Sequence, residues 1–434
     1  MTPATKGAVV VLAGFVITLA LGSLWIWVSI AAELLRPLSA GGVHGWTVRQ
    51  VSIPFALAGA SFVLAMFIGG RLQDRLGPRW PSTAGGVLIG MGMMLASMSP
   101  MRIETPSSIS AFMIVGLGLM VGGGAGITFA SVVPPTVKWS IPRYRGLIVG
   151  VLVAGFGLGP AWTNQAVRLF VQTRGVSTML LLQGIVLLAV VVFFSQLLTD
   201  PLRGYVPPGS YETPDGVSDG LLPWAGLSPS KTLAAPAYRA LAVASGLMAG
   251  ASSFLMATLL VESVAHPFSS ASVVLGISVA GGAGALAAGI VHDRVAEFAL
   301  TAVFALIALG LIAAAILTWT DHIVGAVLFT AACSLAAVVV SWVSTMESFG
   351  TRNAGANYVL VFAGGSLGFL LGALAAVSLA GEAFSSSINS AQALFAALVL
   401  ALVLCTAVVL TKRVRPMAVF GAAAGIRSDR RTGA

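Results

Sequence analysis

Twelve long apolar segments, separated by short polar stretches, constrain this chain more than any other feature of its sequence. A helix needs about 20 mostly apolar residues to cross a bilayer, and each segment is about that long or longer. Only 9% of the residues are charged, whereas soluble domains carry roughly 25%. So few charges cannot cover a water-facing surface. The chain is therefore predicted to be an all-α membrane protein with twelve transmembrane helices.

The segments form two sets of six with a polar stretch between them. The first set has the approximate bounds 7–31, 50–70, 80–99, 107–134, 145–171 and 175–198. The second set has the approximate bounds 236–262, 270–291, 297–318, 324–346, 354–380 and 389–411. The stretch between the sets is rich in Pro, Gly, Ser and Asp, which is typical of a linker. The predicted organisation is an N-terminal six-helix bundle, a cytoplasmic linker, a C-terminal six-helix bundle and a basic cytoplasmic tail, at 1–198, 199–235, 236–411 and 412–434.

Basic residues show which ends of the helices face the cytoplasm. With twelve spans, 18 of the 23 Lys and Arg residues fall on the side of the N-terminus, and five fall on the other side. Cytoplasmic loops of membrane proteins carry an excess of these residues. Both termini are therefore predicted to be cytoplasmic.

Two related loops follow the second helix of each expected bundle. Residues 70–79 read Gly-Arg-Leu-Gln-Asp-Arg-Leu-Gly-Pro-Arg, and residues 289–295 read Gly-Ile-Val-His-Asp-Arg-Val. Such a duplication indicates a transporter built from two parallel halves. The glycine lets two helices approach closely. Asp74 can pair with a cation on a neighbouring helix and hold the cytoplasmic side shut, and Arg145 and Arg352 are the candidate partners.

The duplicated loop resembles the motif that joins helices 2 and 3 in the major facilitator superfamily of transporters and recurs, weakened, between helices 8 and 9. The resemblance implies the major facilitator fold of two six-helix bundles. It also implies that the loops act as a conformational latch. The candidate gating residues are Gly70, Asp74, Arg75, Arg79, Arg145, Asp293, Arg294 and Arg352.

Five further stretches resemble one branch of this superfamily, the oxalate/formate antiporters and monocarboxylate transporters. They are 25–27 (Trp-Ile-Trp), 45–47 (Gly-Trp-Thr), 138–146 (Lys-Trp-Ser-Ile-Pro-Arg-Tyr-Arg-Gly), 154–160 (Ala-Gly-Phe-Gly-Leu-Gly-Pro) and 349–358 (Phe-Gly-Thr-Arg-Asn-Ala-Gly-Ala-Asn-Tyr). The resemblance implies secondary active transport of a small organic acid, with a monocarboxylate favoured, by proton symport or by exchange as an antiporter. It also implies a monomer.

The chain departs from that branch where the branch places cations. The helix 8 arginine position aligns with Ala285, and the helix 11 lysine position aligns with about Gly364. This departure leaves open a second function, a carrier or efflux pump for neutral or amphiphilic small molecules. Polar and aromatic residues of the central helices are then the candidates for substrate binding: Trp25, Trp27, Ser29, Thr128, Ser252, Ser253, Ser341, Trp342, Asn357 and Tyr358.

Two carboxylates at similar places in the two halves are candidates for proton coupling. Glu33 ends the first helix and Glu262 ends the seventh, both near the outer face. An ionisable group at depth in the membrane is costly and suggests a function. At a helix end, however, the side chain can also reach water without any such function.

Other classes of protein are disfavoured by what the sequence contains. The glycine-rich fourth helix lacks the strand that a dinucleotide fingerprint needs, and the chain has no phosphate-binding loop sequence. The four histidines are scattered and suggest no metal site, and no basic face suggests nucleic acid. We expect no enzymatic activity and no cofactor, with a small-molecule substrate, protons and the lipid bilayer as partners in a cytoplasmic (inner) membrane. A membrane sensor that has lost transport is the remaining alternative.

Overall fold

The structure is a computed structural model, and it describes residues 2–34, 46–99, 110–202, 205, 226–263, 271–294, 309 and 323–380. Helices dominate these residues. Seven of the described segments are long and apolar enough to cross a membrane by length and composition. The predicted all-α membrane fold is confirmed.

The N-terminal bundle is formed by helices up to Ser195. Its elements are α1 (Pro3–Gly22), η1 (Ser23–Ile26), α2 (Trp27–Leu34), α3 (Val48–Leu76), α4 (Arg79–Ser97), η3 (Met113–Val121), α5 (Gly122–Trp139), η4 (Pro142–Tyr144) and α6 (Arg145–Ser195). Short 3-10 turns continue α1 into α2, and the π-helical η3 runs directly into α5. The fifth and sixth predicted spans form one element, α6, which is broken at Gly175 by a φ of 82° that favours glycine.

The C-terminal bundle follows a short helix of the linker. The elements are α7 (Pro229–Ala234), α8 (Pro236–Ser263), α9 (Ala271–Arg294), α11 (Ile323–Phe349) and α12 (Ala354–Ala380). The predicted segments 297–318 and 389–411 and the basic tail lie outside the described residues, apart from the single residue Leu309. The other ten predicted segments all coincide with helices. The first spans α1, η1 and α2, the fourth spans η3 and α5, the fifth and sixth share α6, and each of the rest matches one helix.

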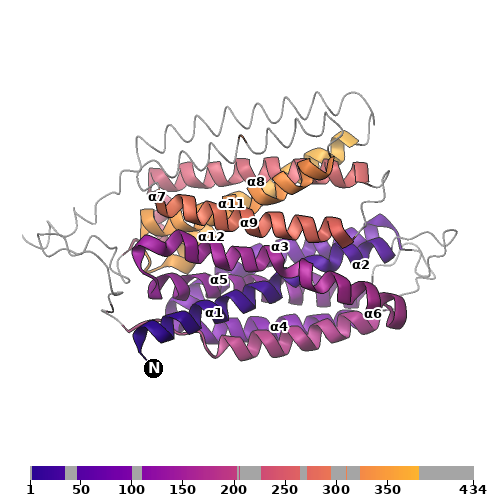
Figure 1. Cartoon of the computed structure of the whole chain (residues 1–434), viewed down its shortest axis with the longest axis horizontal. Coiled ribbons are helices and arrows are strands. Elements are labelled where there is room, and N and C mark those ends of the chain that lie inside the picture. Colours follow the sequence, from indigo (N-terminus) through magenta and orange to yellow (C-terminus); the bar gives the residue numbers. More distant parts are fainter. Residues whose placement is uncertain are drawn as a thin grey trace, which may run out of the picture.

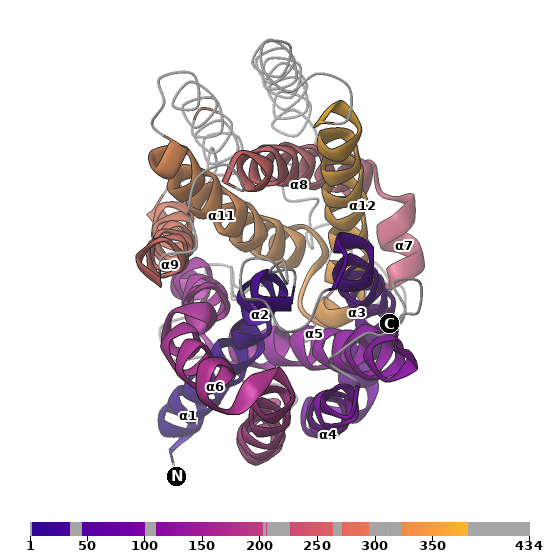
Figure 2. The same ribbon diagram turned by 90° about the vertical axis from the view of Figure 1, so that its right-hand side faces the viewer.

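The two bundles meet along two seams, α6 against α9 and α3 against α12 (Figure 2). At the end that carries α7, α12 begins beside α3, and toward the other end the two helices separate (Figures 1 and 2). The basic residues place α7 on the cytoplasmic side. Along this seam the bundles therefore approach each other at the cytoplasmic end and diverge toward the other end.

Glycines bring helices together within each bundle as well as between bundles. In the C-terminal bundle, Gly246 and Gly250 of α8 face Gly364, Gly368 and Gly372 of α12. A methyl group added to Gly364 would lie 2.6 Å from the carbonyl oxygen of Ala242 on α8. Small residues at this spacing allow backbones to pack directly in a membrane. The α8–α12 pair is therefore packed too closely for larger side chains.

Replacing Gly368 with alanine should destabilise the C-terminal bundle. The new methyl group would overlap the backbone of Gly246, and overpacking of this kind costs about 1–3 kcal/mol. Gly365→Ala is the matched control, because its added methyl group would meet its nearest neighbour, the carbonyl oxygen of Ser245, at 3.7 Å. The melting temperature of the purified protein in detergent measures both. Equal melting temperatures for the two variants would contradict the close packing.

Candidate functional site

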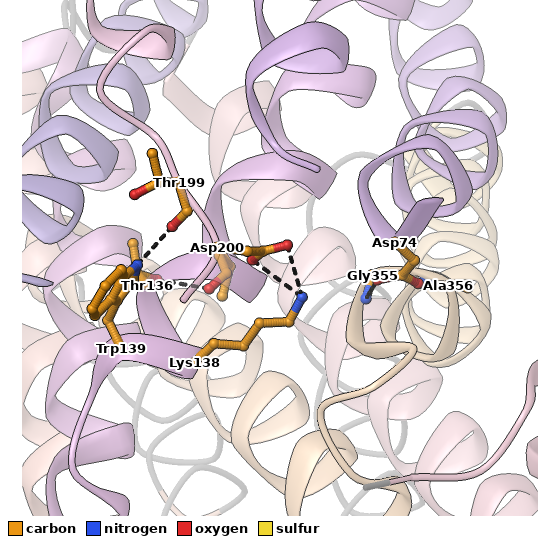
Figure 3. A network of polar contacts seen from close by, with 9 residues as sticks. Asp74, Thr136, Lys138, Trp139, Thr199, Asp200, Gly355 and Ala356 are labelled. Carbon is orange, nitrogen blue, oxygen red and sulfur yellow. Dashed lines mark hydrogen bonds and ion pairs between the residues drawn. The ribbon is translucent and has the colours of Figure 1, made fainter. Parts of the chain in front are cut away.

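The carboxylate of the first duplicated loop binds the start of a helix in the opposite bundle. Asp74 ends α3, and its two oxygens accept hydrogen bonds from the backbone N–H groups of Gly355 (3.3 Å) and Ala356 (3.0 Å) in the first turn of α12 (Figure 3). Gly70, one turn earlier, packs directly on Gly355, because a methyl group at Gly70 would lie 2.6 Å from the Gly355 carbonyl oxygen. We call this contact the first clasp.

The second duplicated loop makes the same contact in the opposite direction. Asp293 ends α9, and its two oxygens accept hydrogen bonds of 2.7 Å from the N–H groups of Gly146 and Leu147 at the start of α6. Here Gly289 packs on Gly146, whose added methyl group would lie 2.5 Å from the Gly289 carbonyl oxygen. We call this contact the second clasp. Each bundle therefore caps one helix of the other.

Asp74 binds backbone N–H groups at the start of α12, whereas the sequence predicted the guanidinium group of Arg145 or Arg352 as its partner. The first turn of a helix has N–H groups without intrahelical partners and carries a partial positive charge. A carboxylate placed there gains directed hydrogen bonds and a favourable electrostatic interaction. Arg145 instead opens α6 at the second clasp, where its side chain is 5% exposed and interacts electrostatically with Glu347.

A buried ion pair fixes the start of the linker beneath the N-terminal bundle. The Lys138 ammonium lies 3.1 and 3.2 Å from the two carboxylate oxygens of Asp200 (Figure 3). Next to it, the Trp139 indole donates to the Thr199 carbonyl oxygen (2.6 Å), and Arg79 Nε donates to the Leu198 carbonyl oxygen (3.0 Å). Burial raises the pKa of Asp200 above its usual value, and the neighbouring Lys138 opposes that shift. Arg79, a predicted gating residue, thus lies at the anchor of the linker.

The end of the linker is fixed to the C-terminal bundle at the first clasp. Leu227 donates its N–H to the Phe349 carbonyl oxygen (2.8 Å). Its own carbonyl oxygen accepts hydrogen bonds from the side-chain amides of Asn353 (2.9 Å) and Asn357 (3.1 Å). Asn357, a predicted substrate residue, therefore contacts the linker at the cytoplasmic end.

A connected group of aromatic rings lies above the clasps and spans both bundles. In the N-terminal bundle, Trp25 contacts Phe55 and Phe156, and Phe129 contacts Phe156 and Phe62, with ring centroids 5.4–6.4 Å apart. Aromatic pairs at these separations attract each other beyond their burial of area. We call this group, together with the rings of the other bundle, the aromatic layer.

The C-terminal bundle contributes Trp342, Tyr358 and Phe362 to the aromatic layer. Trp342 and Tyr358 stack with ring centroids 3.2 Å apart, and Tyr358 contacts Phe362 at 5.5 Å. Two contacts cross between the bundles, Phe129 with Trp342 at 6.4 Å and Phe62 with Phe362 at 6.1 Å. Trp342 and Tyr358 are fully buried. The layer therefore joins the bundles above the clasps.

The aromatic layer also contains buried donors. Neither Trp342 Nε1 nor Tyr358 Oη has a hydrogen-bond partner among the described residues. A buried polar group left without a partner costs roughly 1–3 kcal/mol. At the other edge of the layer, Trp25 is 42% exposed and Phe55 38% exposed. The layer thus runs from accessible rings on the outer side to buried donors on the inner side.

Several other predicted substrate residues lie in helix contacts. Thr128 Oγ1 donates to the Gly124 carbonyl oxygen (2.9 Å) beside α4, and Ser253 Oγ donates to Gly250 (3.1 Å). Ser341 and Ser245 share a hydrogen bond of 2.8 Å between α11 and α8. Trp27 is buried in the core of the N-terminal bundle.

The remaining predicted residues fall into two groups. Ser252 is buried and has no hydrogen-bond partner for its hydroxyl among the described residues, and Glu33 is partly buried. The side chains of Ser29 and Glu262 lie outside the described residues. Arg75, Arg294 and Arg352 are exposed at the cytoplasmic end. The structure thus brings Trp25, Trp342 and Tyr358 together in one layer.

Sequence reasoning missed the four phenylalanines that connect these rings, Phe62, Phe129, Phe156 and Phe362. Phenylalanine is common in membrane helices, and each of these residues is ordinary in its own segment. The signal that could have found them is the recurrence of an aromatic residue at the middle of helices 2, 4, 5 and 11, all of which face the centre of the fold.

The positions where the resembled branch carries cations are used for helix packing. The carbonyl oxygen of Ala285 on α9 would lie 2.9 Å from a methyl group added to Gly150 of α6, and Ala285 itself is fully buried. Gly364 lies in the α8–α12 contact described above. A side chain at Gly364 would meet the backbone of α8, and a longer side chain at Ala285 would start from a fully buried position.

A comparison with family models gives one result that covers most of the chain. The model described as Major Facilitator Superfamily matches residues 10–373. The chain belongs to the Major Facilitator Superfamily. As a facilitator protein it is a transporter by family, and the two clasps are its form of the duplicated loop motif.

Individual facilitator proteins are similar to this chain at low sequence identity. The uncharacterised MFS-type transporter YhjX of Escherichia coli is 26% identical over 366 residues, which cover 79% of this chain and 85% of that protein. The oxalate:formate antiporter of Oxalobacter formigenes is 23% identical over 194 residues, which cover 42% of this chain and 44% of that protein. Both relatives are transporters, and they leave the substrate of this chain open.

Solved structures share the fold. The human organic anion transporter MFSD10 has a TM-score of 0.65 and 17% identity, covering 93% of this chain and all of that one. The proton:xylose symporter XylE has a TM-score of 0.63 and 13% identity, covering 95% and 96%. At these identities the likeness shows the facilitator fold of twelve helices in two bundles and nothing about substrate.

Asp74→Asn should weaken the first clasp and reduce transport far more than substrate binding. The neutral amide loses its charge interaction with the α12 terminus, which is worth about 0.3–1 kcal/mol and up to about 2 kcal/mol when partly buried. The outward-facing state then loses population. Arg71→Gln, an exposed change in the same loop, is the control. Transport and equilibrium binding of one solute measure the effect, and an equal loss of both would argue for misfolding or for a direct role in the site.

Lys138→Met should destabilise the protein by about 3–5 kcal/mol, because it leaves the Asp200 carboxylate buried without its ammonium partner. The pKa of Asp200 is already raised, and this change raises it further. The penalty is therefore present at neutral pH and shrinks as pH falls through that raised pKa, since Asp200 then carries a proton. Denaturation in detergent at about pH 7.5 and about pH 5 measures it. The double variant Lys138→Met/Asp200→Leu should recover part of the loss at neutral pH, and no recovery would contradict the ion pair.

Proposed function

We propose that this facilitator protein moves a small organic acid, with a monocarboxylate favoured, across the cytoplasmic (inner) membrane. It works by alternating access, either as a proton symporter or as an exchanger. The two bundles rock about the aromatic layer, and the clasps close the cytoplasmic side in the outward-facing state. The single observation that carries the proposal is the pair of buried donors, Trp342 Nε1 and Tyr358 Oη, at the junction of the bundles.

The donors suit an acid because a carboxylate accepts hydrogen bonds from indole and phenol groups. Outward-facing access begins at Trp25 and Phe55, which are accessible. When the bundles rock, the Phe129–Trp342 and Phe62–Phe362 contacts must separate, and the donors become available to a solute held between the bundles. The similarity to an oxalate:formate antiporter favours an acid for the same site. A neutral donor pair replaces the fixed cations that the resembled branch uses.

A second candidate function is the transport of neutral or amphiphilic compounds, including efflux. The packing of Ala285 and Gly364 between helices favours it, because no fixed cation stands at either position to hold an anion. An aromatic surface also suits apolar solutes. The two candidates differ in whether binding depends on the charge of the solute.

We expect the remaining partners to follow from membrane transport. The lipid bilayer surrounds the bundles, the working unit is a monomer, and protons are the coupling ion if the acid is carried by symport. Glu33 and Glu262 remain proposed proton carriers near the outer side. Glu33 is partly buried in α2.

Thermal stabilisation by matched solutes tests the proposal. Small monocarboxylates are compared with their amides and esters on the purified protein, at about pH 5.5 and about pH 7.5. A ligand stabilises by about RT ln(1 + [L]/Kd), so even millimolar binding is visible at high concentration. We expect an acid to raise the melting temperature and its amide to have no effect.

Variants connect that result to the aromatic layer. Trp342→Phe and Tyr358→Phe remove the donors and keep the rings, and each should weaken binding of the acid about tenfold, which corresponds to about 1.4 kcal/mol for a lost hydrogen bond to a charge. Phe362→Leu is the control for loss of aromatic area without loss of a donor. Stabilisation by amides or esters alone would favour the neutral-solute function instead.

A further inference from the structure

The two clasps correspond residue by residue, but they differ in which groups can gain or lose a proton. Gln73 precedes Asp74 in the first clasp, and His292 precedes Asp293 in the second. Both preceding residues are buried, with Gln73 fully buried and His292 4% exposed. The amide of glutamine does not titrate, whereas histidine changes charge in the physiological pH range. The second clasp therefore has a titratable group where the first has a neutral one.

The residues that accompany the two clasp carboxylates within their own bundles also differ: Lys138 lies in the bundle of Asp74, and Glu347 lies in the bundle of Asp293. Lys138 and Glu347 each lie eight residues before the glycine that receives a clasp, Gly146 and Gly355 respectively. Lys138 forms the ion pair with Asp200, with 3.1 Å between Nζ and Oδ1. Glu347 lies at the cytoplasmic end of α11, with a side chain that is 46% exposed. It can exchange protons with the cytoplasm.

The titratable groups of the second clasp lie together at the seam between the bundles. His292 Nε2 lies 3.6 Å from Glu347 Oε2 and has no hydrogen-bond partner among the described residues. Arg145, the first residue of α6, interacts electrostatically with Glu347 across the seam. Asp293 caps the same helix. The buried imidazole therefore contacts the same carboxylate that attracts the arginine of the other bundle.

We propose that His292 and Glu347 form a proton-binding site that controls the second clasp, so that protonation from the cytoplasm favours opening of the cytoplasmic side. The inference rests on the alternating-access part of the proposed function, and it is independent of the substrate. It gives the transporter a proton site at the inner gate, far from Glu33 and Glu262.

Only interactions between the bundles decide the direction of the effect. The His292–Glu347 and His292–Asp293 contacts lie within the C-terminal bundle and persist in both states. The Glu347–Arg145 attraction crosses the seam, and a proton on Glu347 removes it. A proton on His292 places a positive charge 3.6 Å from the Glu347 carboxylate, where it competes with Arg145 for that carboxylate. Each protonation therefore weakens closure, since a ligand shifts an equilibrium by its differential interaction with the two states.

The other charged groups near His292 do not reverse this direction. Arg294, on its own helix, and Arg143 and Tyr144 in η4, which packs against α9, are all exposed at the cytoplasmic end. Charges in contact with water are screened. The α6 and α11 groups that face the site are Arg145 and Glu347, already considered.

The test measures the cytoplasmic gate directly, in the absence of substrate. Spin labels are placed at Leu76→Cys on α3 of the N-terminal bundle and at Leu233→Cys on α7, the linker helix that packs against α8 and α12; both positions are exposed. Cys333 and Cys405 are replaced by alanine. Distance distributions are recorded in nanodiscs at about pH 7.5 and about pH 5.5. We expect the population with the longer distance to rise severalfold at the lower pH.

Variants separate the two protonated groups. Glu347→Gln, which imitates the protonated carboxyl group, should raise the longer-distance population already at the higher pH. His292→Gln gives the second clasp the residue of the first and should reduce the pH effect, and the double variant should lose it. Lys6→Gln, a change at an exposed position near the start of α1, is the control and should keep the full effect.

The outcomes distinguish this inference from the proposed function. A pH-independent distribution in the native protein, or an unchanged pH effect in both His292→Gln and Glu347→Gln, would overturn the proton site. If His292→Gln does not fold, the distance distribution of Glu347→Gln still tests the proton site. Failure of every acid to bind would overturn the proposed substrate and leave the gate measurement unaffected.

Discussion

The arrangement of the two bundles depends on carboxylates that cap helices across a seam. Asp74 and Asp293 each end a helix in one bundle and accept two backbone hydrogen bonds at the start of a helix in the other. Such a contact is strong only while the helix terminus and the carboxylate are aligned, because the unpaired N–H groups point along the helix axis. A small rotation of one bundle breaks the alignment. The clasps therefore favour two discrete arrangements of the bundles, one with the contacts formed and one with the contacts broken, over a continuous series of intermediate arrangements.

Close backbone packing makes those states rigid and also limits the chemistry available to the fold. Gly70 and Gly289 let the clasping helices touch their partners, and Gly364 lets α12 lie on α8. Each glycine removes a place where a polar side chain could stand. Aromatic rings contribute contacts between the bundles, and Trp342 Nε1 and Tyr358 Oη are the buried donors without partners among those rings. In the proposed function these neutral donors hold the solute in place of a fixed cation.

Segment lengths, the distribution of basic residues and the duplicated loop were sufficient to predict the membrane class and the twelve-helix fold, and they singled out Asp74, which contacts the other bundle. The partner of Asp74 was not predictable, because a backbone N–H has no signature in the sequence and an arginine does. Asn357 looked like a cavity residue for the same reason, since its contact with the linker carbonyl depends on a fold-back of the chain. Phe129 was missed because its neighbours in space come from helices far apart in sequence. Residues whose role depends on contacts between distant segments leave the weakest pattern in the sequence.

The stacking of Trp342 on Tyr358 has an optical consequence. The chain has nine tryptophans, and Trp342 is a buried one whose ring touches Phe129 of the other bundle. Indole emission depends on the polarity around the ring and on quenching by close neighbours. Rocking of the bundles must move Phe129 away from this indole and admit water or solute beside it. The intrinsic fluorescence of the molecule therefore carries a signal of which side is open, without any attached dye.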